Sequence, residues 1–347
     1  MGYYIGCDVS MKAISVCVME GNGKVVLRKD VVASPDALLL VIKPYISRSL
    51  VGLEAGSTSN WLYHGLQKAG VKVVCLETHH AKKVLSAQPV KTDRNDAEGL
   101  AQLLRTGWYK TVHVKQDDTQ ELKCWLEARE MLKHKQQDIK NSIRGLVKPF
   151  GIIFPAGTEY KWIDAVKKRL GNERPGLAKV ILPLLSVYET ICDEMEKYTT
   201  FIEMYAKKDE LCQRLMTIDG IGPMNAVAFK AVIENPERFD SNRDVGAYLG
   251  LTPRIYASGE TERRGHISRA GSEIMRSLLF EAAQVLLTRV KQMSTLKSWG
   301  MRLCKKKPGK VVVAALARKL AVMMLAIWKN GTTFQSTREK ISLAMVG

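Results

Sequence analysis

The first 76 residues alternate short apolar runs with helix signals, and this alternation constrains the fold more than any other feature of the chain. Five segments have the apolar composition of strands: 3–9, 13–19, 24–32, 50–54 and 71–76. Gly21-Asn22-Gly23 reads as a hairpin turn, Ser34-Pro35 as a helix start, and residues 61–68 as a helix that stops at Gly70. Strands alternating with short helices predict an α/β layer with a partly parallel sheet.

The middle of the chain has helical periodicity. A helix is expected from Thr92 to Arg105, followed by a long amphipathic helix over 117–147. Residues 151–176 are rich in Gly and Pro and are expected to be irregular, and helical spacing returns over 177–208. Two long charged helices with a break between them indicate a helical hairpin or coiled coil, which suits the pairing of subunits.

The last third differs again in pattern. Residues 215–233 contain the segment Ile218-Asp219-Gly220-Ile221-Gly222-Pro223, and a loop that is rich in Gly, Arg and Ser is expected to follow to about residue 270. Helices are then expected at 272–292 and 311–329, joined by a link that contains the basic run 305–310.

The charge of the chain is concentrated near its C-terminus. The 347 residues carry 53 Lys and Arg against 35 Asp and Glu, a formal net charge of +18. Residues 216–347 hold 21 of the basic and 10 of the acidic side chains. A basic surface of this kind attracts polyanions, because each neutralised phosphate releases condensed counterions. The charge distribution therefore favours binding to nucleic acid.

Other features narrow the class of protein. The N-terminal residues lack the pattern of a secretory signal, and no uncharged apolar run reaches the roughly 18 residues of a membrane span. The seven cysteines form no Cys-x-x-Cys pair and have no zinc-ligand spacing with the six histidines. We therefore expect a cytoplasmic protein with reduced thiols, no structural zinc and no membrane partner.

Four carboxylates stand out by position: Asp8, Glu54, Asp93 and Asp96. Asp8 and Glu54 end predicted strands, and strand ends in an α/β sheet converge on the edge that binds ligands. Asp93 and Asp96 are three residues apart at a helix start, so they share a face. Hard oxygen ligands of this kind suit Mg²⁺ or Mn²⁺, and two such ions support chemistry at a phosphodiester. The alternative is that each carboxylate is an ordinary turn or cap residue.

A set of motifs follows the same order along nearly the whole chain. They are Gly6-Cys7-Asp8-Val9-Ser10, Leu53-Glu54-Ala55, Lys91-Thr92-Asp93-Arg94-Asn95-Asp96-Ala97, Ile218-Asp219-Gly220-Ile221-Gly222, Gly250-Leu251-Thr252-Pro253-Arg254, Ser258-Gly259 and Ile267-Ser268-Arg269-Ala270-Gly271. Together they resemble the DEDD transposases of the insertion-sequence 110 family, which includes the Piv and MooV DNA invertases and RNA-guided bridge recombinases. The departures, Met11 after Ser10 and Ala55-Gly56-Ser57, change no carboxylate.

The resemblance implies an architecture and a set of site residues. It implies an α/β RNase H-like domain of the RuvC type over 1–115, a helical coiled-coil connector over 116–210, and a mainly α transposase domain over 211–340. Asp8, Glu54, Asp93 and Asp96 would be metal ligands for Mg²⁺, with Mn²⁺ possible, and Ser258 the nucleophile. Family members act as oligomers on DNA, and some are directed by a structured non-coding RNA, so a homodimer or homotetramer with double-stranded DNA is expected.

The surroundings of Ser258 suit that role. Gly259 permits close backbone approach, and Arg254, Arg263 and Arg264 flank the serine with guanidinium groups suited to phosphate. Without the resemblance a Ser-Gly pair is more often a turn. Ser268 is the second candidate, although a helix N-cap region is its ordinary role.

Further residues are candidates for contact with nucleic acid. The candidate residues are Gly220, Gly222, Arg254, Arg263, Arg264, Arg269, Lys305, Lys306 and Lys307. Residues 218–226 resemble a helix-hairpin-helix turn, whose glycines let backbone N–H groups approach a phosphate. The alternative for this segment is a tight helix connection that binds nothing, and for the lysine run it is a solvated loop.

Three functions are compatible with these features. The first is a site-specific DNA recombinase that cuts and rejoins strands through a phosphoserine intermediate, in a site assembled between domains. The second is a metal-dependent structure-specific nuclease that uses water. The third is a non-catalytic nucleic-acid-binding protein, which would leave the four carboxylates without a role. The recombinase, associated with the nucleoid in the cytoplasm, is the expected function.

Overall fold

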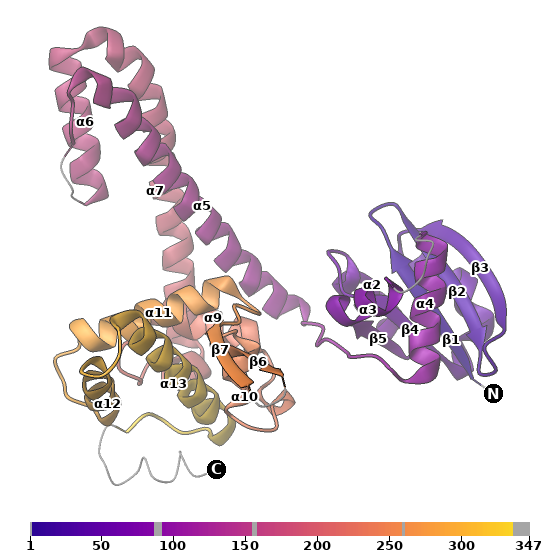
Figure 1. The fold of residues 1–347 in the computed structure, drawn as a ribbon. Coiled ribbons are helices and arrows are strands. Elements are labelled where there is room, and N and C mark those ends of the chain that lie inside the picture. The colour runs from indigo at the N-terminus through magenta and orange to yellow at the C-terminus, as the bar shows by residue number, and fades with distance from the viewer. Residues whose placement is uncertain (1, 87–91, 155–157, 259–260, 336–347) are drawn as a thin grey trace. The chain divides into compact units, whose positions relative to one another are not determined.

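The structure is a computed structural model that describes residues 2–86, 92–154, 158–258 and 261–335. Contacts divide the chain into two compact units, residues 1–116 and residues 117–347. Figure 1 labels the helices and strands of both units.

The first unit is built on a five-stranded sheet. Its strands are β1 (Tyr3–Val9), β2 (Ala13–Glu20), β3 (Val25–Val32), β4 (Ser49–Glu54) and β5 (Val73–Leu76). They are arranged in the order β3-β2-β1-β4-β5, with β1 antiparallel to β2 and parallel to β4. This arrangement of an antiparallel meander extended by two parallel strands confirms the predicted partly parallel α/β layer.

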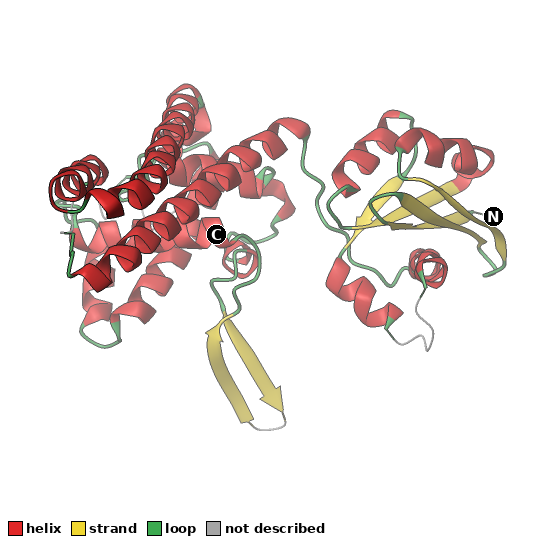
Figure 2. Cartoon of the chain, turned by 90° about the horizontal axis from the view of Figure 1, so that it is seen from above, coloured by secondary structure: helices red, strands yellow, loops and turns green. Residues whose placement is uncertain are grey.

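Helices cover both faces of this sheet, as Figure 2 shows from above. They are α1 (Pro35–Ile42), α2 (Ser59–Lys68), α3 (Thr78–Leu85) and α4 (Asp93–Thr106), with a 3₁₀ turn at Lys43–Arg48. Ile5 and Val51 pack with leucines of α1 and α2 on one face. Leu76 packs with leucines of α4 on the other face. Each strand therefore alternates its side chains between two apolar layers.

Local sequence explains where the helices begin and end. The Ser34 hydroxyl accepts the backbone N–H of Ala37 at 3.2 Å, which caps α1 as the Ser-Pro pattern predicts. The Thr92 hydroxyl caps α4 in the same way, through the N–H of Asn95 at 3.2 Å. Gly107, with a φ of 72°, ends α4 in the left-handed conformation.

The second unit begins with a helical hairpin of α5 (Asp117–Val147) and α7 (Pro175–Lys208). The helices run antiparallel: Trp125 stacks on Phe201 with ring centroids 3.9 Å apart, and Gln136 Nε2 donates to Cys192 Sγ at 3.1 Å. The predicted helical hairpin is therefore present. Pairing of these helices with a second chain as a coiled coil stays a prediction.

The expectation that residues 151–176 are irregular is wrong. A 3₁₀ turn at Lys148–Phe150 is followed by a helix, α6 (Glu159–Glu173), which packs against α5 and α7. Lys140 Nζ donates to Glu159 Oε2 at 2.7 Å, and the ring of Trp162 meets that of Tyr188. Gly171 lies within the last turn of α6, and Pro175 and Gly176 begin α7.

The rest of the second unit forms a mainly helical body. It contains α8 (Glu210–Leu215), α9 (Pro223–Ile233), a 3₁₀ turn at Pro236–Arg238, α10 (Asp244–Tyr248), β6 (Pro253–Ser258), β7 (Thr261–Ile267), α11 (Glu273–Thr288), α12 (Thr295–Cys304) and α13 (Gly309–Asn330). Its core lies between α9, α11 and α13. Two expectations are corrected: the loop predicted up to residue 270 contains α10 and a β-hairpin, and α12 lies between the two predicted C-terminal helices. Ser294 starts this extra helix by accepting the N–H of Lys297.

Two helices, α7 and α13, are long and apolar enough to cross a membrane by length and composition alone. Half of the apolar stretch of α13 is buried inside the unit. Core helices of soluble proteins share these properties, so the two helices are weak evidence for a membrane span.

Candidate active site

Two of the four carboxylates lie on neighbouring parallel strands. β1 and β4 pair with Cys7 opposite Leu53, so Asp8 and Glu54 follow at the same level near the carboxyl ends of the two strands. Both residues are half-buried. In an α/β sheet this edge is where ligands bind.

Alternation along the strands directs both carboxylates to the face that α4 covers. Side chains two residues apart on a strand point to the same face, and two residues before each carboxylate is a glycine, Gly6 or Gly52. A Cβ at Gly6 would lie 2.1 Å from the carbonyl oxygen of Ala97, and one at Gly52 would lie 2.8 Å from Cδ1 of Leu104. The glycines therefore let α4 approach the sheet closely beside the carboxylates.

The direction of α4 brings its first turn to the same edge. Tyr4, near the start of β1, packs in the leucine cluster of the second half of α4. Gly6, further along β1, faces Ala97. The end of β1 therefore lies beside the beginning of the helix, which carries Asp93 and Asp96. Lys91, which opens this motif, lies outside the described residues.

Ion pairs tie α4 to β3. Arg94 donates through Nε at 3.2 Å and Nη2 at 2.9 Å to Oδ2 of Asp30, and the Ser15 hydroxyl donates to Asp30 Oδ1 at 2.8 Å. The hydrogen bonds from Arg94 and Ser15 lower the pKa of Asp30. Arg28 pairs with Glu98 one turn further along α4. Because Arg94 lies between the two aspartates of α4, its contact with Asp30 positions the turn that carries them.

The donor set fits a divalent cation by chemistry and by the placement of its elements. Asp96 is buried, with 9% of its surface exposed, and Asp93 is exposed. The side chains of the four carboxylates do not converge on one point: within the described residues, no three His, Cys, Asp or Glu could hold a metal ion together. Neighbouring carboxylates repel one another unless a cation lies between them, and carboxylate oxygens are ligands of Mg²⁺ and Mn²⁺.

Ser258 ends the first strand of the β6–β7 hairpin. The register pairs Ser258 with Thr261 and Tyr256 with Arg263, so these four positions belong to one face of the hairpin. Tyr256 is 60% exposed. Figure 2 shows the hairpin extending from the helical body. Gly259, the next residue, lies outside the described residues.

The other residues expected beside Ser258 have different positions. In the register of the hairpin, Arg264 stands opposite Ile255. Residues 248–252 and 268–271, which flank the hairpin in the sequence, form its foot. Arg254 donates through Nη2 to the carbonyl oxygen of Ser268 in this foot at 3.1 Å. Arg263 pairs with Tyr256 and so shares the face of position 258. The backbone N–H of Ser268, the second candidate, donates to the carbonyl oxygen of Thr252 at 2.8 Å.

Two motifs pack together at the foot of the hairpin. Gly250 has a φ of 68°, and a Cβ on it would lie 2.4 Å from the N and O atoms of Ala270. Gly271 has a φ of 66°, and a Cβ on it would lie 2.2 Å from the Tyr248 carbonyl oxygen. The N–H of Arg269 donates to Gly250 at 3.2 Å. The two glycines are thus required by positive φ and by close contact between two segments.

Arg276 of α11 joins the same segments from within. Its guanidinium, 8% exposed as a residue, donates to the carbonyl oxygens of Leu249 at 3.4 Å, Gly271 at 3.1 Å and Ala270. Burial lowers the pKa of Arg276. Sequence reasoning did not select this residue, although an arginine in an apolar helical segment was a signal for it.

The glycines of 218–226 have internal contacts. Gly220 has a φ of 88°, and a Cβ there would lie 2.8 Å from the Ala282 carbonyl oxygen of α11. The N–H of Gly222 donates to Asn225 Oδ1 at 3.2 Å, and Asn225 Nδ2 donates to Leu278 at 2.8 Å. These contacts favour the alternative of a tight helix connection, and a phosphate contact there stays a prediction.

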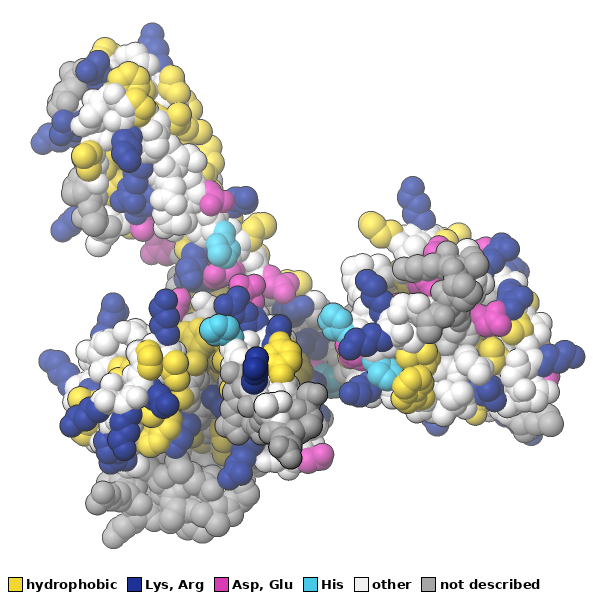
Figure 3. All heavy atoms as spheres, in the orientation of Figure 1, with side chains coloured by type: hydrophobic (Ala, Val, Ile, Leu, Met, Phe, Trp, Pro, Cys, Tyr) yellow, Lys and Arg dark blue, Asp and Glu magenta, His cyan; other side chains and the backbone are white. Residues whose placement is uncertain are grey.

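Lys305, Lys306 and Lys307 are exposed in the turn after α12. Figure 3 shows other Lys and Arg side chains spread over the same helical body. Their exposure is compatible with the predicted phosphate contact and with a solvated loop.

Comparison with known families identifies the chain. A model described as the transposase IS116/IS110/IS902 family matches residues 212–298, and a DEDD transposase model of the IS110 type matches residues 5–152. The chain belongs to the IS110/IS116/IS902 family of transposases. It is an enzyme with a DEDD catalytic domain, and such a domain implies a divalent metal ion.

Relatives of this transposase span most of its length. The transposase for insertion sequence element IS1111A of Coxiella burnetii is 26% identical over 336 residues, covering 95% of this chain and 91% of the relative. The transposase for IS1328 of Yersinia enterocolitica is 26% identical over 337 residues, covering 95% and 98%. Thermus thermophilus RuvC in complex with a Holliday junction substrate aligns with 14% identity and a TM-score of 0.27, over 32% of this chain and 100% of RuvC.

Proposed function

We propose that this transposase is a site-specific DNA recombinase whose four carboxylates hold a divalent cation and whose Ser258 attacks the scissile phosphodiester. The observation that carries the proposal is the placement of Asp8 and Glu54 on adjacent parallel strands beside the first turn of α4. The position of Ser258 at the end of an exposed hairpin, on one face with Arg263, supports the serine step.

The step balances without an external reactant. The Ser258 oxygen forms a bond to phosphorus as the bond from phosphorus to one deoxyribose oxygen breaks, and the serine proton ends on that leaving oxygen. A deoxyribose hydroxyl of the partner strand then reverses the step and restores the serine. Asp8, Glu54, Asp93 and Asp96 would hold a Mg²⁺ or Mn²⁺ ion, which would supply positive charge to the phosphate oxygens. Arg263 supplies a guanidinium suited to the same phosphate.

The carboxylates have a separate task in this scheme. Asp8 and Glu54 present oxygens from fixed strands, while Asp93 and Asp96 present theirs from a helix that Asp30 and Arg94 hold in place. Because these backbone elements are held in place, rotation of the side chains is the change needed to bring their oxygens to one ion.

The proposed partners follow from the charge and from the family. They are double-stranded DNA of the element and its target, a structured guide RNA, and further copies of the chain in a dimer or tetramer. The long α5–α7 hairpin is the proposed element for pairing of copies, and the proposed location is the nucleoid in the cytoplasm. The expected cation is Mg²⁺.

A denaturing gel tests the proposal. Labelled element-junction DNA is incubated with Mg²⁺ and element RNA, using wild type, Ser258→Ala, Asp93→Ala and, as a matched control, Ser298→Ala on α12. We expect protein-linked DNA with wild type and Ser298→Ala, and none with the other two, while DNA binding persists in all four. Free cleaved DNA that is unchanged by Ser258→Ala would instead establish hydrolysis by water.

A further inference from the structure

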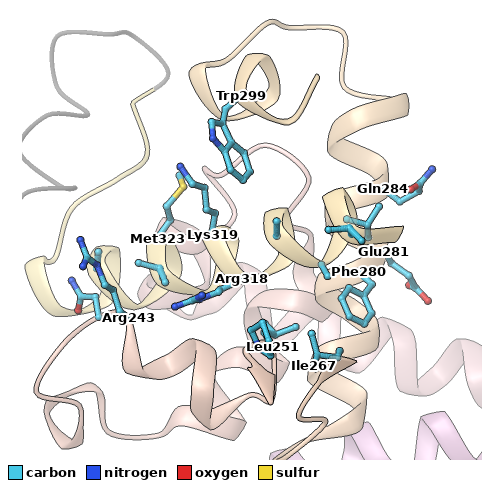
Figure 4. Close-up of a pocket in the computed structure, with 18 of the residues that line it drawn as sticks. Arg243, Leu251, Ile267, Phe280, Glu281, Gln284, Trp299, Arg318, Lys319 and Met323 are labelled. Carbon is cyan, nitrogen blue, oxygen red and sulfur yellow. The ribbon is translucent and has the colours of Figure 1, made fainter. Parts of the chain in front are cut away.

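A large open cavity lies in the second unit between the foot of the hairpin and helices α11, α12 and α13 (Figure 4). Its volume is about 1590 Å³, and Ala315, Val322 and Met323 of α13 contribute apolar surface to it. This volume exceeds the roughly 300–1,000 Å³ of sites for small ligands. A segment of a polymer therefore suits the cavity better than a metabolite does.

The cavity is strongly basic. Five basic residues line it: Arg243, Arg269, Lys310, Arg318 and Lys319. Glu281 is the one acidic residue in the described lining, and its carboxylate is 3.7 Å from Lys133 Nζ. In the part of the chain that the structure describes, Arg243, Arg318 and Lys319 have no carboxylate partner. The charge of the lining is therefore complementary to an anion.

Two of these cations are partly withdrawn from water. Lys319 Nζ lies 4.2 Å from the ring centroid of Trp299, and burial lowers the pKa of Lys319. Arg318 packs beside α10, where a Cβ on Gly246 would lie 3.0 Å from its Nε. Figure 4 shows Arg318 and Arg243 on the same side of the cavity. Removing a cation from water without a counter-charge costs free energy, which an incoming anion recovers.

The mixed lining distinguishes between forms of nucleic acid. A duplex presents its phosphates outward and keeps its bases stacked inside, so it gains nothing from the apolar surface of α13. An unpaired strand presents both phosphates and base faces, and grooves that bind such strands combine positive charge with aromatic or apolar surface.

We propose that this cavity binds unpaired nucleotides of the DNA strand that the transposase cuts, with phosphates on Arg243, Arg318 and Lys319 and bases on the apolar surface of α13. Pro253 and Ile267 of the hairpin also line the cavity, so it opens at the foot of the hairpin that carries Ser258. The proposal that the bound strand is DNA rests on the proposed function. The proposal that an unpaired strand binds here rests only on the charge and the apolar surface of the cavity.

The test measures binding without chemistry. A labelled single strand of roughly 12 nucleotides, within the range that single-strand sites cover, is titrated by fluorescence anisotropy in EDTA. The variant is Arg318→Gln with Lys319→Gln, which keeps most of each side-chain stem. The control is Lys161→Gln with Lys168→Gln, which removes the same charge from exposed positions on α6.

We expect the cavity variant to bind the single strand about tenfold more weakly than wild type, as the loss of charge-assisted contacts implies. The slope of log K against log salt should fall by about 1.4, or about 0.7 for each lost phosphate contact. The control should change neither quantity beyond the effect of net charge, and binding of a matched duplex should change no more in the cavity variant than in the control.

Several results would overturn the inference. These are equal single-strand affinity in the cavity variant and the control, an equal loss for the duplex, or a loss seen with an RNA strand and absent with DNA. A cavity that seats a second copy of the chain would change sedimentation of the cavity variant and leave single-strand binding intact. Because the assay needs no cleavage, its failure leaves the serine and metal proposal standing, and a failure of cleavage leaves this result standing.

Discussion

Gly6 of β1 and Ala97 of α4 approach so closely that a Cβ at position 6 would lie 2.1 Å from the Ala97 carbonyl oxygen. This contact seats the helix that carries Asp93 and Asp96 on the strand that carries Asp8. The glycine in the first motif therefore determines the geometry of the candidate metal site without contributing a ligand.

Gly6→Ala should destabilise the first unit by about 3 kcal/mol, because the clashing atoms belong to the backbone of α4 and cannot rotate away. Urea unfolding followed by circular dichroism measures this change. Gly56→Ala is the matched control, since a Cβ there meets nothing closer than 4.0 Å. Equal stability of the two variants would contradict the close seating of α4.

Asp8→Asn should abolish stabilisation by a divalent cation. In wild type, Mn²⁺ at about 100 times its Kd should raise the free energy of unfolding by about 2.7 kcal/mol, because the ion binds the folded state. Thermal unfolding with and without Mn²⁺ measures the effect. Asp36→Asn, at an exposed position on α1, should retain it, and a full shift in Asp8→Asn would exclude Asp8 as a ligand.

Arg276→Ala should destabilise the second unit by about 3 kcal/mol, since it leaves buried carbonyl oxygens without their donor. Hydrogen exchange should report the loss at residues 249–271, where the guanidinium joins two segments. Arg289→Ala, at the exposed end of α11, should change stability little. Unchanged exchange in Arg276→Ala would show that the foot of the hairpin does not depend on this residue.

Asp209 should contribute a pH-dependent part of the stability. Burial raises the pKa of its carboxyl group, but hydrogen bonds from Lys230 and the Cys212 N–H outweigh burial and lower the pKa below its usual value. The contribution is therefore present above about pH 4 and is lost as the pH falls through the lowered value. Asp209→Asn should cost about 1 kcal/mol at neutral pH and less at pH 2. Denaturant unfolding at both pH values, with Glu203→Gln as the exposed control, checks the difference.

Lys319→Met should affect stability and binding in opposite directions. Burial lowers the pKa of Lys319, so its charge is disfavoured in the free fold, and a neutral side chain of similar length should raise the free energy of unfolding by about 0.5 kcal/mol. Single-strand binding should weaken in the same variant. Loss of stability together with unchanged binding would indicate that Lys319 only packs against Trp299.

The sequence predicted the elements whose apolar pattern is continuous. The strand signals near Asp8 and Glu54 and the long helix over 117–147 are confirmed because burial on one face imposes a strict period on them. Helix α6 was missed, although Trp162, Val166 and Leu170 recur at helical spacing, because Gly and Pro at its ends dominated the interpretation.

The hairpin and the contacts of the site were harder to predict. The described side chains of β6 and β7 are exposed or half-buried and few of them are apolar, so their alternation gives little hydrophobic signal. The contacts of Asp30 with Arg94 join residues 64 positions apart, and no local pattern encodes them. The order of the motifs in the sequence identified the four candidate carboxylates. Their placement at one sheet edge depends on strand register and on the direction of α4, which the motifs do not encode.

The hairpin that carries Ser258 is fixed at one end and extends from the helical body at the other. Its strands have exposed side chains at Ile255 and Tyr256, while its foot is fixed by Gly250, Gly271 and Arg276. At about 3.3 Å per residue, β6 reaches about 17 Å from foot to tip, so a rotation of about 10° at the foot moves position 258 by about 3 Å. A displacement of that size would move a hydroxyl at position 258 out of the distance at which it could attack a phosphorus atom. The packing of two glycines and one buried arginine therefore sets the position of the proposed nucleophile at the other end of the hairpin.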